Sequence, residues 1–171
     1  MSALKRSEII EAVQDAIILE DHFHNVERWV GKSADQSGNN WGTQSSLTHF
    51  TAISGDGDFG SDADDEAKIV GSDDTPLVAG NTHFDAHRIM CVSASNANPF
   101  LLRLIYGTGT MQQAITAGQY SEIMVTEARK GSPIEVRMPR VASGTKMWAQ
   151  AKNATDNATI DFFMGIHEYA E

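Results

Sequence analysis

Three residues of types that bind metals alternate along one short stretch of the chain. His83, Asp85 and His87 are separated by single residues. Side chains two apart in a β-strand lie on the same face, so a strand here would point all three groups the same way. Imidazole and carboxylate are ligands of Zn²⁺ and Fe²⁺, and the spacing therefore suits a transition-metal site. We favour the simpler interpretation that these histidines lie at the surface or form ordinary hydrogen bonds.

A second histidine pair, His22 and His24, lies near Glu27. This spacing resembles the first metal motif of cupins, which are jelly-roll proteins. Here the glutamate comes too early for that motif, and the chain has no convincing second motif with a distal histidine. A cupin-like metal-dependent enzyme is therefore the least favoured of three functional hypotheses. The other two, a carbohydrate-binding module and a structural protein, are described below.

An acidic stretch between residues 54 and 66 offers oxygen ligands for Ca²⁺ through Asp56, Asp58 and Asp62. A helix-flanked calcium loop that began at Asp56 would need glycine at its sixth position and glutamate at its twelfth. Those positions hold Ser61 and Ala67 instead. A solvated acidic loop is the favoured interpretation, and a bound Ca²⁺ is the alternative.

Other catalytic patterns find little support in the chain. No Gly-x-Ser-x-Gly nucleophile motif is present. Residues 107–110, Gly-Thr-Gly-Thr, resemble the start of a dinucleotide fingerprint but lack its third glycine and the helix that follows. We therefore predict no catalytic residues and a protein that is not an enzyme.

Three tryptophans suggest an alternative hypothesis for the function, namely a carbohydrate-binding module in which sugars stack on aromatic rings. Trp29 and Trp148 fall in predicted strands, and Trp41 falls in a turn-rich segment. Each of them is also well suited to be an ordinary core or loop anchor.

Charge is distributed unevenly along the 171 residues, whose formal net charge is −10. Residues 1–86 carry sixteen acidic against five basic side chains, whereas residues 87–171 carry seven against eight. Binding to nucleic acid phosphates requires a basic surface that releases counterions, so this balance argues against a nucleic-acid partner.

The single cysteine, Cys91, excludes an intrachain disulfide, so the fold must depend on packing. Its apolar neighbours predict a buried structural thiol. The sequence shows neither a leader-like apolar segment at its start nor a run of membrane-spanning length. We expect a soluble protein that folds in a cytoplasm, with no membrane partner.

Helical spacing is confined to the first twenty residues, where Ser7 is a plausible N-cap. Ile9, Ile10, Val13 and Ile17 form its apolar stripe. A helix this short is marginal alone and must dock. We predict an amphipathic arm over residues 1–20, which packs either on its own domain or on another subunit, and a second unit over residues 21–171.

Alternating apolar and polar residues predict about eight short strands after the arm. The strongest pattern covers residues 132–169, in which Ile160, Phe162, Met164 and Ile166 share one face of the last strand. Because no helix separates the strands, parallel crossovers are not expected. The predicted class is all-β, an antiparallel jelly-roll-like β-sandwich preceded by a short α-helix.

Residues 139–149 (PRVASGTKMWA) and 158–169 (ATIDFFMGIHEY) resemble the closing strands of β-sandwich virion proteins from tailed bacteriophages. Residues 38–42 and 107–120 carry a weaker similarity. The resemblance implies a non-enzymatic structural protein of the virion, assembled in the host cytoplasm. It implies a capsid decoration protein, or else a component of the neck, tail or fibre, and it carries no binding residue to this chain.

A decoration protein would bind the major capsid protein as a homo-oligomer, and a trimer would suit a local threefold site of a shell. In that case Ile9, Ile10, Val13 and Ile17 would form the assembly face. No cofactor is expected.

Overall fold

β-Strands form most of the protein that the computed structural model describes, namely residues 27–33, 47–61, 65–70, 82–126 and 129–170. In chain order the strands are β1 (Glu27–Val30), β2 (Lys32–Ser33), β3 (Leu47–Thr48), β4 (Phe50–Asp56), β5 (Ala67–Val70), β6 (His83–Ala94), β7 (Phe100–Gly107), β8 (Tyr120–Val125), β9 (Pro133–Glu135), β10 (Val141–Ala142), β11 (Lys146–Asn153) and β12 (Thr159–Tyr169). A short helix, α2 (Met111–Thr116), lies between β7 and β8, directly after residues 107–110. The prediction that no helix separates the strands is wrong here, because Thr110 and Gln113 form a capping box that begins the helix. The all-β class is confirmed.

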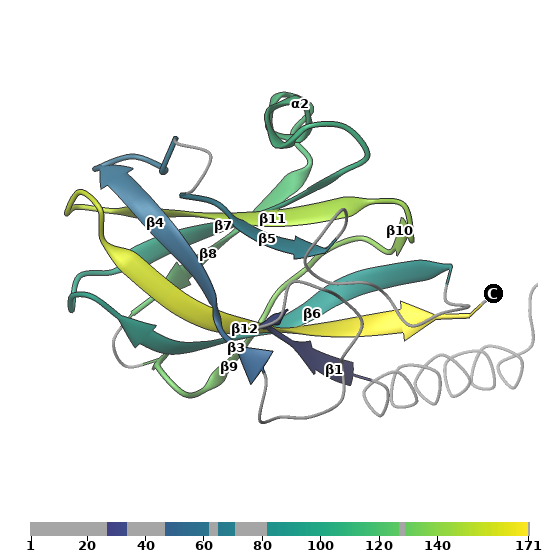
Figure 1. The fold of residues 1–171 in the computed structure, drawn as a ribbon, viewed down its shortest axis with the longest axis horizontal. Coiled ribbons are helices and arrows are strands. Elements are labelled where there is room, and N and C mark those ends of the chain that lie inside the picture. Colours follow the sequence, from purple (N-terminus) through teal and green to yellow (C-terminus); the bar gives the residue numbers. More distant parts are fainter. Residues whose placement is uncertain (1–26, 34–46, 62–64, 71–81, 127–128, 171) are drawn as a thin grey trace, which may run out of the picture.

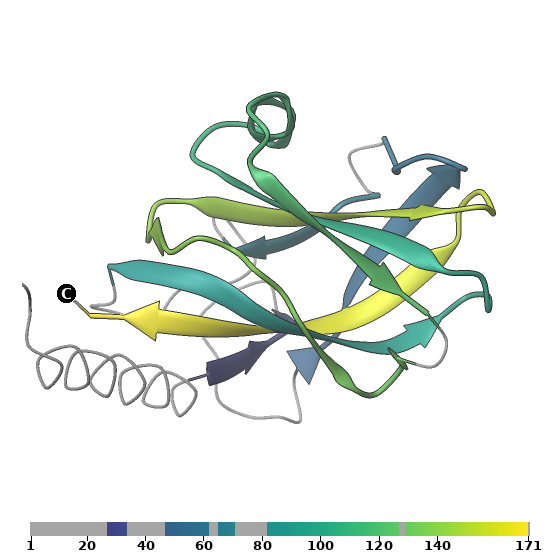
Figure 2. The ribbon, with the colours of Figure 1, turned by 180° about the vertical axis from the view of Figure 1, so that it is seen from behind.

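One curled sheet contains ten of the described strands, while β2 and β3 pair with each other. Its hydrogen-bonded order is β10-β6-β12-β4-β11-β7-β8, with β1 beside β12, β5 beside β11 and β9 beside β6. Figures 1 and 2 show that the curl produces two layers, one containing β6 and β12 and the other containing β7 and β11.

The predicted antiparallel arrangement is wrong at one place, because β4 runs parallel to β11 over Ser54–Asp56. The other pairings of the described strands are antiparallel. The reason lies in how β4 changes layers. Its first half pairs antiparallel with β12, and a tight turn reverses the chain between β11 and β12. A strand that continues from β12 to β11 without turning must therefore meet β11 in parallel.

β4 changes layers at Ser54, which is buried with 1% of its surface exposed. Its Oγ donates a hydrogen bond to the Thr155 carbonyl (2.9 Å) and accepts one from the Ala158 amide (3.2 Å). Its own amide donates to the Ala158 carbonyl, and the Asn157 amide donates to the Ser54 carbonyl. These bonds tie the corner in β4 to the turn that joins β11 to β12.

The core lies between the two layers and confirms the predicted face of the last strand. Ile160, Phe162, Met164 and Ile166 are all fully buried. From the opposite layer, alternate residues of β7 and β11 point inward, among them Leu102, Leu104, Met147, Ala149 and Ala151. Burial of this apolar surface is the main source of stability in a chain without a disulfide.

The segment 54–66, predicted to be a loop throughout, contains ordered strand structure. β4 continues to Asp56, and Phe59 forms single bridges to Ser54 and Lys152. Gly57 adopts a φ of +67°, which lets the chain reverse sharply. At Gly60 a Cβ would collide with the Ile53 carbonyl, so the returning chain packs directly on β4.

Several predictions concern residues outside the described part of the chain. The helix over residues 1–20, with its stripe of Ile9, Ile10, Val13 and Ile17, lies there and stays a prediction, as does the pair of His22 and His24. The turn-rich loop around Trp41, predicted over residues 32–44, is wrong at Lys32–Ser33, which form β2, and the rest of it lies outside the described residues. None of the described residues belongs to a helix with the length and apolar character that a membrane crossing requires.

Candidate functional site

A cluster of titratable side chains on the outer face of β6 and β12 contains Asp85, His87, His167 and Tyr169. Antiparallel pairing places Asp85 opposite His167. The His167 Nδ1 lies 3.3 Å from Asp85 Oδ1, and the side chains of His167 and Asp85 are 5% and 17% exposed. This carboxylate and imidazole are therefore largely withdrawn from water.

Tyr169 engages the second oxygen of Asp85. Its hydroxyl donates a 2.6 Å hydrogen bond to Asp85 Oδ2. Partial burial, together with the bond to the Asp85 carboxylate and its negative charge, raises the pKa of Tyr169 to about 12. The guanidinium of Arg140 lies 3.6 Å from the centroid of the Tyr169 ring, where a cation–π contact forms.

A bulge in β6 brings His87 into the same cluster. Gly165 pairs with Arg88 and Ile166 with Ala86, so His87 is the additional residue opposite β12. Its ring stacks on His167 with centroids 4.5 Å apart and an interplanar angle of 27°. The backbone carbonyl of His87 accepts a hydrogen bond from the Val136 amide (2.8 Å). Simple alternation along a strand does not predict this arrangement.

The predicted triplet of His83, Asp85 and His87 is thus only partly brought together. His83 Nδ1 lies 3.0 Å from the hydroxyl of its neighbour Thr82, and Asp85 and His87 both contact His167. No three His, Cys, Asp or Glu side chains within the described ranges are grouped so as to hold a metal ion. What the cluster provides is a hydrogen-bonded brace between β6 and β12, with both oxygens of its carboxylate engaged.

A second polar group gathers serine, histidine and aspartate side chains around Asp161. Thr51 Oγ1 donates to Asp161 Oδ1 (2.7 Å), Ser93 Oγ donates to Asp161 Oδ2, and His49 Nε2 lies 3.4 Å from Oδ1. The carboxylate is central here. In a catalytic triad the imidazole lies between the serine and the acid and removes the serine proton. Here the carboxylate lies between Ser93 and His49, so this arrangement does not activate the serine as a nucleophile.

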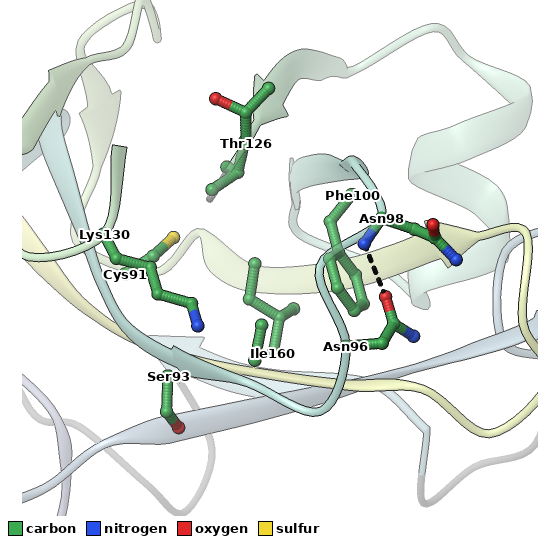
Figure 3. A pocket seen from close by; sticks show the side chains of 10 residues that line it. Cys91, Ser93, Asn96, Asn98, Phe100, Thr126, Lys130 and Ile160 are labelled. Carbon is green, nitrogen blue, oxygen red and sulfur yellow. Dashed lines mark hydrogen bonds between the residues drawn. The ribbon is translucent and has the colours of Figure 1, made fainter. Parts of the chain in front are cut away.

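Cys91 borders a small cavity between the layers, which Figure 3 shows with Phe100, Lys130 and Ile160 around it. Its volume of about 10 Å³ is the space of a single water molecule. The thiol is 1% exposed, and burial raises its pKa to about 12. The predicted buried structural thiol is confirmed, because a nucleophilic cysteine needs exposure and a lowered pKa.

The predicted calcium ligands do not converge in the described part of the acidic segment. Asp56 and Asp58 are exposed, and Asp62 lies outside the described residues. The group that holds this segment is centred on Arg103, whose guanidinium lies between the rings of Phe59 and Tyr120, 3.7 and 4.6 Å from their centroids.

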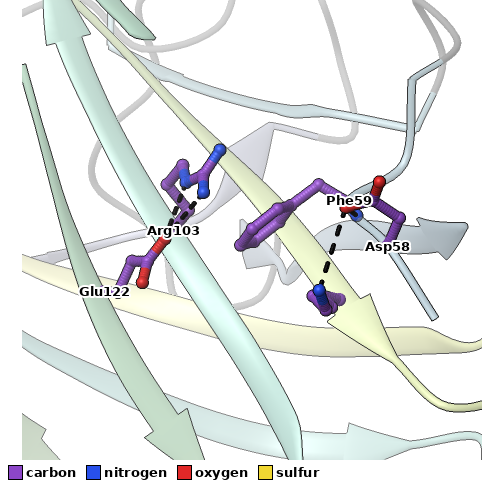
Figure 4. A network of polar contacts seen from close by, with 5 residues as sticks. Asp58, Phe59, Arg103 and Glu122 are labelled. Carbon is purple, nitrogen blue, oxygen red and sulfur yellow. Dashed lines mark hydrogen bonds and ion pairs between the residues drawn. The ribbon is translucent and has the colours of Figure 1, made fainter. Parts of the chain in front are cut away.

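Glu122 completes the Arg103 group. Arg103 Nε and Nη2 both donate to its Oε1, at 3.0 and 2.7 Å, as Figure 4 shows. The two residues lie directly opposite each other on β7 and β8. Only the register between β7 and β8 reveals this cross-strand pair.

The tryptophans predicted as possible sugar platforms have different positions. Trp148 is 7% exposed and packs with Ile105 and Ala114 beneath α2. Trp29 on β1 is half-buried, and Trp41 lies outside the described residues. The position of Trp148 is that of a core anchor.

In comparisons with known proteins, no protein-family model, curated protein or solved structure matches the chain.

Proposed function

We propose that this chain is a non-enzymatic structural protein of a tailed-phage particle, a capsid decoration or other head-associated protein. The proposal depends on the resemblance of residues 139–149 and 158–169 to the closing strands of virion proteins. These two segments include β10, the first half of β11 and all of β12. That half of β11 pairs with β5 and β7, and β12 pairs with β1, β4 and β6. The resembling segments therefore form the central strands of both layers.

The contacts of the outer faces support a rigid building block. The cluster around Asp85 braces one layer, and the Arg103 group fastens the Phe59 turn and β8 to the other. A subunit that must keep its shape on a particle without disulfides gains from such cross-strand bonds.

The finer architecture belongs to the same proposal. A jelly-roll-like sandwich would expose its loops to solvent and present the arm of residues 1–20 to a shell or a sister subunit. Ile9, Ile10, Val13 and Ile17 would then contact the major capsid protein or another copy, with a trimer as the favoured assembly.

Analysis of purified particles of the encoding phage tests the proposal. Mass spectrometry should detect the chain in intact virions, and imaging should place it on the head in a copy number that fits the shell symmetry. Placement on the neck, tail or fibre would retain a structural role and reject decoration. Absence of the chain from purified virions would contradict the proposal.

A further inference from the structure

β1 is a short strand at an edge of the curled sheet. It has four residues, and among the described strands it pairs with β12 alone. Only Val30 of these residues is fully buried. Glu27 and Arg28 begin the strand and form ion pairs with Arg88 of β6 and Glu168 of β12, respectively. These two charged contacts therefore add to the backbone pairing with β12 and the burial of Val30.

The Glu27 carboxylate is buried, and its ion pair with Arg88 is long. Its side chain is 8% exposed, and its Oε2 lies 3.3 Å from Arg88 Nη1. Charge-assisted hydrogen bonds are commonly 2.7–2.9 Å long, so this one is weak. Oε1 is fully buried and accepts no hydrogen bond from any described residue. Burial of a carboxylate with one unused oxygen costs free energy that would be regained if the side chain returned to water.

Gly165 makes the position of Glu27 possible. The Glu27 side chain lies across this glycine on the outer face of β12, and a Cβ on Gly165 would collide with the carboxylate and lie 3.0 Å from Glu27 Cδ. The glycine is not required by its φ, and its role is to leave room. We call Glu27, Arg88 and Gly165 the Glu27 latch.

We propose that β1 is a detachable strand, which opens from β12 as a unit while the rest of the curled sheet stays folded, and that the Glu27 latch sets how often it opens. Opening uncovers the edge of β12 over Met164–His167. Segments with few buried contacts commonly open below the global unfolding free energy. The inference does not depend on the proposed virion role.

Hydrogen–deuterium exchange of the full chain at neutral pH tests the proposal, read from peptides that cover β1, β7 and β11. In the wild-type protein the β1 amides should exchange faster than those of β7 and β11. Arg88→Gln leaves the Glu27 carboxylate buried without a cation, and Gly165→Ala displaces it. Each variant should accelerate β1 exchange by about tenfold and leave β7 and β11 unchanged.

Two controls separate the latch from a general loss of stability. Gly144→Ala adds a methyl group where no atom lies within 4 Å, and it should leave β1 exchange unchanged. The double variant Glu27→Gln with Arg88→Gln removes both charges and should return β1 exchange toward the wild-type rate. Equal exchange of β1, β7 and β11 in the wild-type protein would overturn the proposal. So would single variants without effect, or a double variant as fast as Arg88→Gln.

Discussion

At the scale of single residues, Asp85 shows how the chemistry of a side chain depends on its neighbours. Its two oxygens interact with His167 and Tyr169, which lie more than eighty residues later in the sequence. Alternation with His83 and His87 indicates a shared face but contains no information on what lies opposite that face. The bulge at His87 adds a ring stack that alternation does not predict.

We predict that Asp85→Asn lowers both the pKa of Tyr169 and the stability of the fold. The substitution removes the charge that disfavours the tyrosinate and weakens the acceptor for the hydroxyl. The free energy of unfolding should fall by about 1–3 kcal/mol because buried polar partners lose their bonds. Absorbance titration and urea unfolding measure the two effects. Asp56→Asn, at an exposed position, is the control and should change neither quantity.

The same Tyr169 pKa gives a dependence on pH with a definite sign. Because the folded-state pKa, about 12, lies above the ordinary value of 10.0, the folded state holds this proton more tightly. The resulting stabilisation is complete below about pH 10 and is lost as the pH rises through about 12. The difference in stability between wild type and Tyr169→Phe, measured by urea unfolding, should therefore shrink as the pH rises through this alkaline range.

At the scale of elements, the Arg103 group joins three segments that are separate in the sequence. It fastens the turn after β4 to the hairpin of β7 and β8 through two rings and a carboxylate. The prediction of a solvated acidic loop fails at Phe59, where the turn folds back onto the sheet through the bridges of Phe59 to Ser54 and Lys152 and the close packing of Gly60 on β4.

We expect Arg103→Lys to cost about 1 kcal/mol of unfolding free energy. Lysine keeps the positive charge but loses the planar group that contacts two rings and donates twice to Glu122. Urea unfolding measures the loss. Arg137→Lys, an exposed position, provides the matched control. Equal midpoints for the two variants would show that the guanidinium geometry contributes nothing.

The predicted arm over residues 1–20 also belongs to this scale. Ile10→Asp combined with Ile17→Asp should leave the circular dichroism of the β-rich fold intact while it weakens self-association and particle binding. The reason is that charges on an apolar stripe must be desolvated at any interface. Analytical ultracentrifugation and co-sedimentation with particles measure both effects. An unchanged oligomer with unchanged binding would reject the assembly face.

At the scale of the whole molecule, the two layers are connected through β4. The strand passes from β12 to β11 at Ser54, and the turn that joins β11 to β12 bonds to that residue. One buried hydroxyl thus adds two hydrogen bonds to the backbone bonds at the corner of the fold, where the bend leaves backbone groups that the sheet does not satisfy.

Ser54→Ala should therefore destabilise the fold more than an ordinary serine substitution. Loss of the hydroxyl leaves the buried Ala158 amide and the Thr155 carbonyl with fewer partners, at a cost of about 1–3 kcal/mol. Thermal and urea unfolding provide the measurement, with the exposed Ser143→Ala as the reference. A cost no larger than that of the reference would show that the backbone alone holds the corner.

The sequence by itself determined the all-β class, the buried face of β12 and the buried state of Cys91. These features follow from local alternation of apolar and polar residues, which a strand converts directly into inside and outside. Only the tertiary structure decided the parallel β4–β11 pairing, the partners of Asp85 and the rings around Arg103. Each of these depends on the register between strands distant in sequence, and local periodicity does not encode that register.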